Sequence, residues 1–194
     1  MGELAEEVGL NAAATSRIVQ ALKEDAFVRV ASSPENRRKR VVHLERPIEM
    51  LGAWLPLWAR RRMDRRHWDI GARDAEEAMG LLRDAWKEVP GGWAIGGLAG
   101  AAMIRRAVEP AEVLVWAGTE ATARLTDLLQ PLSARPAPGN VRVWLAPDPW
   151  TLGLSALREG LPVADLAQLW LDCSSEGERA LEAADAVANA AGWL

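Results

Sequence analysis

The sequence has little cysteine and little histidine, and this limits the chemistry of its sites. Cys173 is the one cysteine among 194 residues, so the chain can form neither an intramolecular disulfide nor a cysteine-rich metal cluster. The two histidines, His43 and His67, stand in no motif with a serine or cysteine nucleophile, so a hydrolase triad is not indicated. We therefore expect no catalytic residues, no metal site and no cofactor.

Long apolar runs and a secretion signal are also lacking. The longest uncharged run, Val89 to Ile104, holds five glycines and a proline and is shorter than the roughly 20 apolar residues of a membrane span. Glu3, Glu6 and Glu7 stand where a signal peptide would be basic and then apolar. With 49% hydrophobic and 26% charged residues the composition is that of a globular protein. We expect a cytoplasmic protein with no membrane partner.

Charge is distributed unevenly along the chain. Residues 1–66 contain 13 Lys and Arg against 9 Asp and Glu, a balance of +4, whereas residues 67–194 contain 10 against 18, a balance of −8. A basic first third joined to an acidic remainder is typical of a nucleic-acid-binding module attached to a second domain. Chance segregation is the alternative interpretation.

The stretch Glu3–Val28 has the pattern of a helix–turn–helix. Gly9 separates a short helix from a second helix, which we expect to begin at Asn11 because an asparagine side chain can accept a backbone hydrogen bond there. On the inner side, apolar residues of the first helix and the turn are spaced to meet those of the second: Leu4, Val8 and Leu10 against Ile18, Val19 and Leu22.

Polar residues of the second helix are predicted to face outward, as in a helix that enters a DNA groove. They are Thr15, Ser16, Arg17 and Gln20, with Asn11 at the helix start. Arg17 can pair with guanine or reach a phosphate, and Gln20 can read adenine. The alternative is that these residues form only the solvated face of an amphipathic helix.

A basic hairpin follows the helix pair. Val28–Val30 and Arg40–Leu44 are predicted strands on either side of the loop Ser32–Lys39. Four consecutive cations, Arg37, Arg38, Lys39 and Arg40, span the end of this loop and the start of the second strand, and we expect them to lie along DNA phosphates or in the minor groove. A solvated loop is the alternative. Helix pair and hairpin together have the outline of a winged helix–turn–helix.

These motifs resemble the MarR-like winged-helix regulators. The resemblance is carried by Gly9-Leu10, Thr15-Ser16-Arg17-Ile18 and Leu22–Val28. It implies a three-helix core, of which the first helix is absent here. We expect that the true start lies upstream; the alternatives are that the connector helix or a second subunit fills the place of the missing helix. Ala26 stands where such proteins usually have a glycine with positive φ.

The next segment is predicted to connect two domains. Pro47–Trp68 is expected to be a long helix that Pro56 kinks or splits. Its basic end, Arg60–Arg66, is open to two interpretations: it contributes phosphate contacts, or it is a solvated connector. The expected organisation is a winged helix over residues 1–46, a helical connector over 47–68 and a second domain over 69–194.

Residues 69–194 alternate between helix and strand patterns, which favours an α/β domain. The expected helices are Asp74–Glu88, Leu98–Ala107, Thr119–Leu129, a helix entered at Pro162–Ala164 and continuing near Asp165–Leu171, and Glu176–Ala191. The expected strands are Trp93–Ile95, Glu112–Trp116 and Val141–Leu145, and Pro131–Asn140 is expected to be a loop. The overall fold class is therefore α+β.

The glycines of Gly91–Gly97 do not form a nucleotide-binding motif. The Lys-Ser/Thr of a P-loop and the spacing G-x-G-x-x-G are both missing, so a tight strand-to-helix turn explains them better. Strand, Gly-Gly turn and small-residue helix are similar to the nucleotidyltransferase core, but Glu112 is one acid where active members have two, and Gly97 replaces a serine. Asp148 and Asp172 are possible further acids, but they lie far from Glu112 in the sequence, and a lone aspartate is usually a helix cap or a surface group. The domain thus resembles a degenerate nucleotidyltransferase fold.

Most of the chain resembles the AbiEi-like antitoxin regulators of type IV toxin–antitoxin systems. Beyond the winged helix and the connector, the resemblance is carried by Trp93–Ala102, Glu112–Trp116, Pro162–Asp172 and Glu182–Val187. It implies an antitoxin-like transcriptional regulator with a non-catalytic second domain. The implied partners are duplex DNA, a second copy of the chain and a cognate toxin. The alternatives are a nucleotidyltransferase-like enzyme, and a ligand- or protein-interaction domain fused to a winged helix.

Overall fold

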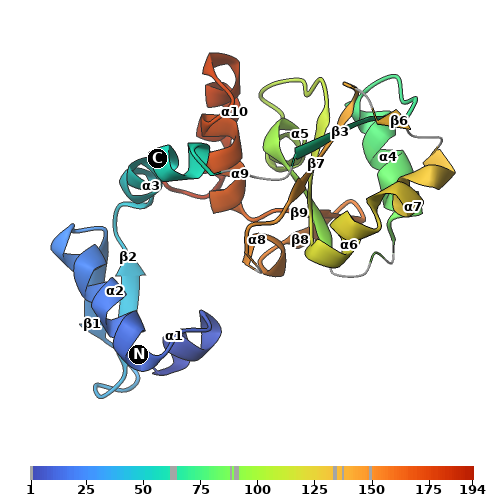
Figure 1. Ribbon diagram of the computed structural model, residues 1–194. Helices are drawn as coiled ribbons and strands as arrows, with labels where there is room; N and C mark the ends of the chain where they lie inside the picture. The colour runs from blue at the N-terminus through green and yellow to red at the C-terminus, as the bar shows by residue number, and fades with distance from the viewer. Residues whose placement is uncertain are drawn as a thin grey trace. The chain divides into compact units, whose positions relative to one another are not determined.

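The computed structural model is a mixed α+β chain that divides into two compact units (Figure 1). It describes residues 2–61, 65–87, 89, 92–132, 135–136, 138–148 and 150–194. Unit 1 comprises Met1–Trp54 and unit 2 comprises Leu55–Gly192. The division falls after residue 54, inside helix α3 (Pro47–Ala59), so this helix begins in one unit and ends in the other.

Two helices open unit 1. Helix α1 (Gly2–Glu7) is followed by Gly9, whose φ of +64° suits a glycine and reverses the chain. Helix α2 (Ala12–Glu24) begins after Asn11, whose side chain accepts a hydrogen bond from the Ala14 amide at 2.8 Å. The expected turn and the expected helix start at Asn11 are therefore confirmed.

A two-stranded hairpin follows the two helices of unit 1. Strands β1 (Val28–Ser32) and β2 (Arg40–Leu44) pair antiparallel, with Val28 opposite Leu44 and Ser32 opposite Arg40. The strands and the loop between them agree with the sequence prediction.

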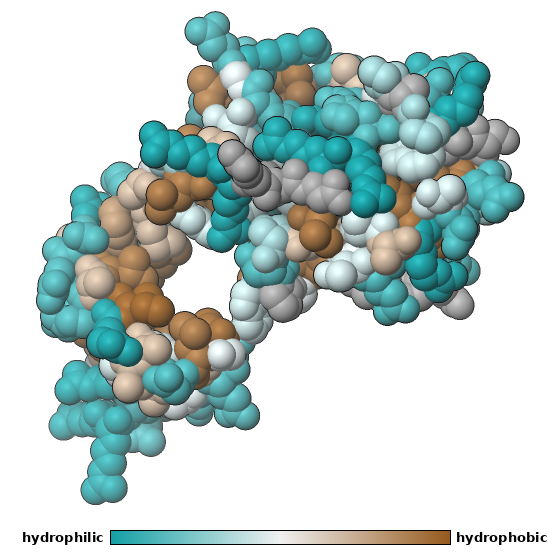
Figure 2. All heavy atoms as spheres, viewed as in Figure 1, coloured by the Kyte–Doolittle hydropathy of each residue, from teal (hydrophilic) through white to brown (hydrophobic). Residues whose placement is uncertain are grey.

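The core of unit 1 is thin. Its buried side chains are small or medium in size and include Ala5, Thr15, Val19 and Val28. Leu10 and Ile18, which were expected to pack inward, are 43% and 48% exposed. The expectation that both would pack inward is therefore wrong. Hydrophobic groups reach the surface of this unit, as the brown spheres in Figure 2 show.

The segment after unit 1 differs from the expected long helix. Helix α3 continues through Pro56 but ends at Ala59, and residues 65–69 form strand β3 (Arg65–Asp69). The predicted helix is therefore wrong over its last residues, and positions 62–64 lie outside the described residues. The physical reason is pairing: β3 is hydrogen-bonded to β7 (Val141–Leu145) along its edge.

Unit 2 is built on one sheet with the strand order β6-β3-β7-β5-β4-β9-β8. Its further strands are β4 (Trp93–Gly96), β5 (Val113–Ala117), β6 (Arg135–Pro136), β8 (Ala156–Arg158) and β9 (Leu161–Val163). The pairs β5/β7 and β4/β9 are parallel and the others antiparallel. The sheet is therefore mixed, and Pro162–Ala164, expected to enter a helix, lies largely in strand β9.

Helices cover both faces of this sheet. They are α4 (Ala75–Ala85), α5 (Gly97–Ile104), α6 (Thr119–Ala123), α7 (Leu125–Leu129), α8 (Trp150–Gly153), α9 (Leu166–Ser174) and α10 (Glu178–Ala190), with a 3-10 turn at Gln130–Leu132. The single helix expected over residues 119–129 is interrupted at Arg124. Among the described residues, no helix combines the length and apolar character needed to cross a membrane.

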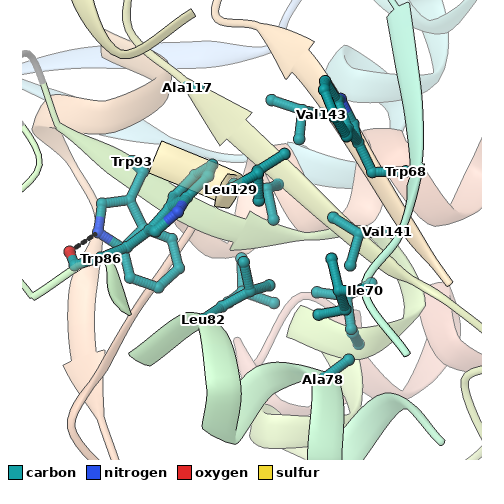
Figure 3. Packing of buried hydrophobic residues seen from close by; sticks show 14 of the residues in the cluster. Trp68, Ile70, Ala78, Leu82, Trp86, Trp93, Ala117, Leu129, Val141 and Val143 are labelled. Carbon is teal, nitrogen blue, oxygen red and sulfur yellow. Dashed lines mark hydrogen bonds between the residues drawn. The ribbon is translucent and has the colours of Figure 1, made fainter. Parts of the chain in front are cut away.

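The main core of unit 2 lies between the sheet and helices α4 and α7 (Figure 3). Leu82, Val143 and Leu129 are at most 1% exposed, and fully burying such a side chain contributes about 1.5–3 kcal/mol. Trp86 and Trp93 pack edge to face with ring centroids 5.4 Å apart, and the Trp93 indole N–H donates to the Trp86 carbonyl at 2.9 Å. This dense core fixes the strands that carry the polar groups of the opposite face.

Candidate nucleic-acid interface and charged pocket

The outer face of α2 presents three of the predicted DNA-reading side chains. Ser16, Arg17 and Gln20 are exposed. Within the described chain the Arg17 guanidinium makes no ion pair or hydrogen bond, whereas Gln20 donates from Nε2 to Glu24 Oε1 at 2.9 Å. Arg17 is thus the group on this face most available to a ligand.

Thr15 and Asn11 have structural contacts. Thr15 is 3% exposed, and its hydroxyl donates to the Asn11 carbonyl at 3.1 Å. The expectation that Thr15 points outward is therefore wrong, because it lies one turn before Val19 on the buried side of the helix. Asn11 is exposed, but its side chain is engaged as the helix cap.

The basic residues at the junction of the β1–β2 loop and β2 are exposed, and hydrogen bonds hold the backbone there. We call Arg37, Arg38, Lys39 and Arg40 the hairpin tip; all four are exposed. The Ser33 amide donates to the Lys39 carbonyl at 2.8 Å, and the side chain of Asn36 accepts from the Arg38 amide at 3.0 Å. Lys39 forms an ion pair with Glu3 at 2.8 Å, while the three arginines make no ion pair among the described residues. The tip therefore presents three available guanidinium groups.

The turn between α2 and β1 is held in a conformation that glycine would prefer. Ala26 has a φ of +57°, which agrees with the expectation that this position usually holds glycine. Arg46 donates to the carbonyl of Ala26 at 2.9 Å and also to the carbonyl of Asp25, and its guanidinium lies 5.3 Å from the ring centre of Phe27. Arg46 is exposed, but its guanidinium is engaged in these contacts within unit 1.

The basic excess of the first third depends on where the boundary is placed. Residues 1–54 contain 8 basic and 8 acidic side chains, a balance of 0, and residues 55–194 contain 15 and 19, a balance of −4. The excess seen over residues 1–66 comes from Arg60–Arg66, of which Arg65 and Arg66 lie in β3. The excess of positive charge in unit 1 is therefore local: it lies at the hairpin tip, whereas the net charge of residues 1–54 is zero.

In unit 2 the Gly96–Gly97 turn is closed by a buried carboxylate. Oδ2 of Asp172 accepts hydrogen bonds from the Gly97 amide and from the Trp116 indole N–H, both at 3.0 Å. Gly97 has a φ of +54°, and a Cβ on Gly96 would lie 2.7 Å from Asp172 Oδ2. The interpretation as a tight turn is thus confirmed for the described part of the motif; Gly91 lies outside the described residues.

Asp172 has no exposed surface. Burial raises the pKa of its carboxyl to about 7, and the hydrogen bonds from Trp116, Gly97 and Gln168 limit the rise. Burial, followed by the nearby carboxylates, also raises the pKa of the thiol of Cys173. Sequence reasoning treated Asp172 as a distant acid; the signal that could have identified it is its position in the apolar run Leu169–Cys173.

Two further carboxylates converge on one arginine. Nε of Arg142 lies 2.9 Å from Glu112 Oε1, a charge contact without hydrogen-bond direction, and its NH2 group donates to Glu176. The Arg142 side chain is 15% exposed and that of Glu176 is 16% exposed. Sequence reasoning identified Glu112 alone.

Within the described residues no group of three or more Asp, Glu, His or Cys is arranged to hold a metal ion.

A row of aromatic side chains lies beside this arginine. Trp116 and Trp144 are paired residues on parallel strands, with ring centroids 5.2 Å apart, and Trp58 of α3 packs on Trp116 at 5.8 Å. On the next strand the Arg65 guanidinium lies 4.5 Å from the ring centre of Trp144. The cluster is open on one side to a pocket of about 410 Å³, which we call the charged pocket; it is lined by Trp58, Ala59, Arg65, Glu112, Arg142, Trp144, Ser175 and Glu176.

Comparison with known proteins gives no family assignment: no protein-family model, curated protein or solved structure matches the chain.

Proposed function

We propose that the chain is a cytoplasmic, DNA-binding transcriptional regulator whose unit 1 is a winged helix–turn–helix. In this proposal α2 enters the major groove, and the hairpin tip lies along the phosphates. The observation that carries the proposal is the pair of exposed basic sites in one unit: Arg17 on α2, and the hairpin tip with three guanidinium groups not committed to ion pairs within the described chain.

Unit 2 is assigned a non-catalytic role in the same proposal. Asp172 fills the N-terminal end of α5, where a phosphate would have to bind, and Arg142 lies between the carboxylates of Glu112 and Glu176. These contacts support the antitoxin-like interpretation over a nucleotidyltransferase-like enzyme. A second copy of the chain and a cognate toxin are the protein partners that this interpretation predicts.

Binding to DNA can be tested on the full chain with duplexes selected from a random pool. Arg17→Ala should weaken binding to the selected sequence by about 1–3 kcal/mol, because a bidentate base contact contributes that much discrimination. Arg38→Ala should weaken all duplexes alike and lower the salt dependence by about one counterion. Mobility-shift titrations at several salt concentrations measure both effects.

A matched control for these variants is Arg106→Ala. It removes the same charge from unit 2, where Arg106 is exposed and paired with Glu109 at 2.6 Å, and it should leave DNA binding unchanged. If the Arg17 and Arg38 variants both bind DNA like the wild type, these residues of unit 1 do not contact DNA and the proposal is wrong.

A further inference from the structure

The charged pocket of unit 2 presents polar groups to a ligand. Trp58 and Trp144 are 1% and 4% exposed, so their rings form closed walls and offer almost no surface for stacking. The open surface comes from the guanidinium of Arg65, the carboxylates of Glu112 and Glu176, and the hydroxyl of Ser175. A ligand of this pocket must therefore be held by charge and hydrogen bonds.

Groups of both signs in the pocket have unused bonding capacity. Among the described residues, Arg65 forms no ion pair, and its guanidinium is held only over the Trp144 ring. Glu112 and Glu176 each use one carboxylate oxygen on Arg142, and the second oxygen of each accepts no hydrogen bond within the described chain. The pocket thus offers both a guanidinium group that can donate hydrogen bonds and carboxylate oxygens that can accept them.

The charges of the pocket cancel. Two guanidinium groups, of Arg65 and Arg142, stand against two carboxylates, of Glu112 and Glu176. A simple anion would be attracted by Arg65 but repelled by the carboxylates, and a simple cation would meet the opposite difficulty. A ligand that carries both signs can match each group with its opposite.

We propose that the charged pocket binds a small zwitterion with one carboxylate and one ammonium group, the class of free amino acids. The ligand carboxylate pairs with Arg65, whose planar fork suits a carboxylate. The ammonium group donates to the free oxygens of Glu112 and Glu176. The site lies wholly within unit 2, so the proposal does not depend on DNA binding by unit 1.

Titration calorimetry on the full chain, without DNA, tests this class of ligand directly. The probes are glycine, alanine and β-alanine, which vary the spacing of the two charges, with acetate and ethylammonium as probes of a single sign. We expect at least one zwitterion to bind, and to bind at least about tenfold more tightly than either single-sign probe. If acetate binds as tightly as the zwitterions, the pocket is an anion site. If no zwitterion binds, the pocket does not bind this class of ligand. Either result overturns the proposal.

Two neighbouring arginines provide a matched pair of variants. Arg65→Gln should weaken the zwitterion by about tenfold or more, since one charged hydrogen-bonding partner is lost. Arg66→Gln removes the same charge from the next residue of β3, which is paired with Val143 and projects to the other sheet face, and it should leave binding unchanged. Glu112→Gln should also weaken the zwitterion while improving acetate relative to the wild type. Equal effects of the Arg65 and Arg66 variants would overturn the assigned site.

Discussion

The two units satisfy a helix N-terminus with the same kind of hydrogen bond in opposite surroundings. In unit 1 the side chain of Asn11 accepts from the Ala14 amide at 2.8 Å in an exposed position. In unit 2 Asp172 accepts from the Gly97 amide at 3.0 Å with 0% exposure. Water can replace the first acceptor but not the second, so burial decides what the bond contributes.

The same difference extends to other side chains. Unit 1 leaves Leu10 and Ile18 partly exposed and Arg17 without an ion pair in the described chain, whereas unit 2 buries Trp116 and pairs Arg142 with carboxylates. A surface that keeps its groups available suits recognition. A domain that holds Asp172 and Arg142 in internal contacts suits a rigid support, and it leaves groups open to a ligand in the charged pocket.

The largest expected effect comes from deleting each of the two acceptors. Asp172→Ala leaves buried donors of Gly97, Trp116 and Gln168 without an acceptor. It should lower the free energy of unfolding by about 3–5 kcal/mol, because each unsatisfied buried donor costs about 1–3 kcal/mol. Asn11→Ala should cost only about 1 kcal/mol. Urea denaturation followed by tryptophan fluorescence reports unit 2, which holds eight of the ten tryptophans, and hydrogen exchange reports α2. Equal losses would remove the contrast between the units.

The second expected effect is a pH dependence of the stability of unit 2 that comes from Asp172. The pKa of Asp172 is raised from 3.8 to about 7 in the folded state, so the folded protein keeps a proton that the unfolded chain releases. The Asp172 contribution to stability is therefore present below about pH 4 and is lost as pH rises toward about 7, by up to about 1.4 kcal/mol per pH unit. Urea titrations from acidic to neutral pH measure the slope. Asp172→Asn, which cannot titrate, should lack this slope; parallel curves for the two proteins would contradict the assignment.

The smallest expected effect lies at the strained turn of unit 1. Ala26→Gly should raise the stability of this unit by about 0.5–1 kcal/mol, because glycine adopts the φ of +57° without steric cost. Ala13→Gly, within the exposed part of α2, should lower stability by about 1 kcal/mol. Hydrogen exchange of α2 amides distinguishes the opposite signs. A loss of protection in both variants would show that Ala26 is not strained.

Local signals in the sequence predicted most elements of both units. Asn11 and Gly9 define the helix start and turn of unit 1, and the apolar run Val113–Val115 before Trp116 identifies strand β5. Strand β3 was missed because Arg65, Arg66 and His67 are exposed and show no apolar alternation, so its pairing with β7 makes it a strand. Strand β9 was missed because its three residues, of which the middle one is Pro162, carry too little periodicity.

The site was predictable where it depends on one segment and not where distant segments meet. Arg17 and the hairpin tip were identified from local patterns, although Thr15 was placed on the wrong face. The contacts of Asp172 with Gly97, and of Arg142 with Glu176, join residues 75 and 34 positions apart. No local pattern contains such a pairing, because only the fold of the sheet and α9 brings these side chains together.

The burial of Cys173 determines how the protein behaves toward thiol reagents. Its thiol is 0% exposed and is held in the protonated form by burial and by the adjacent carboxylates. Only a thiolate is an effective nucleophile, so this sulfur should remain unreactive in the folded protein. A cysteine introduced at exposed Ser16 would then be the one reactive thiol, and a fluorophore attached there could follow α2 without removing any native residue of unit 2.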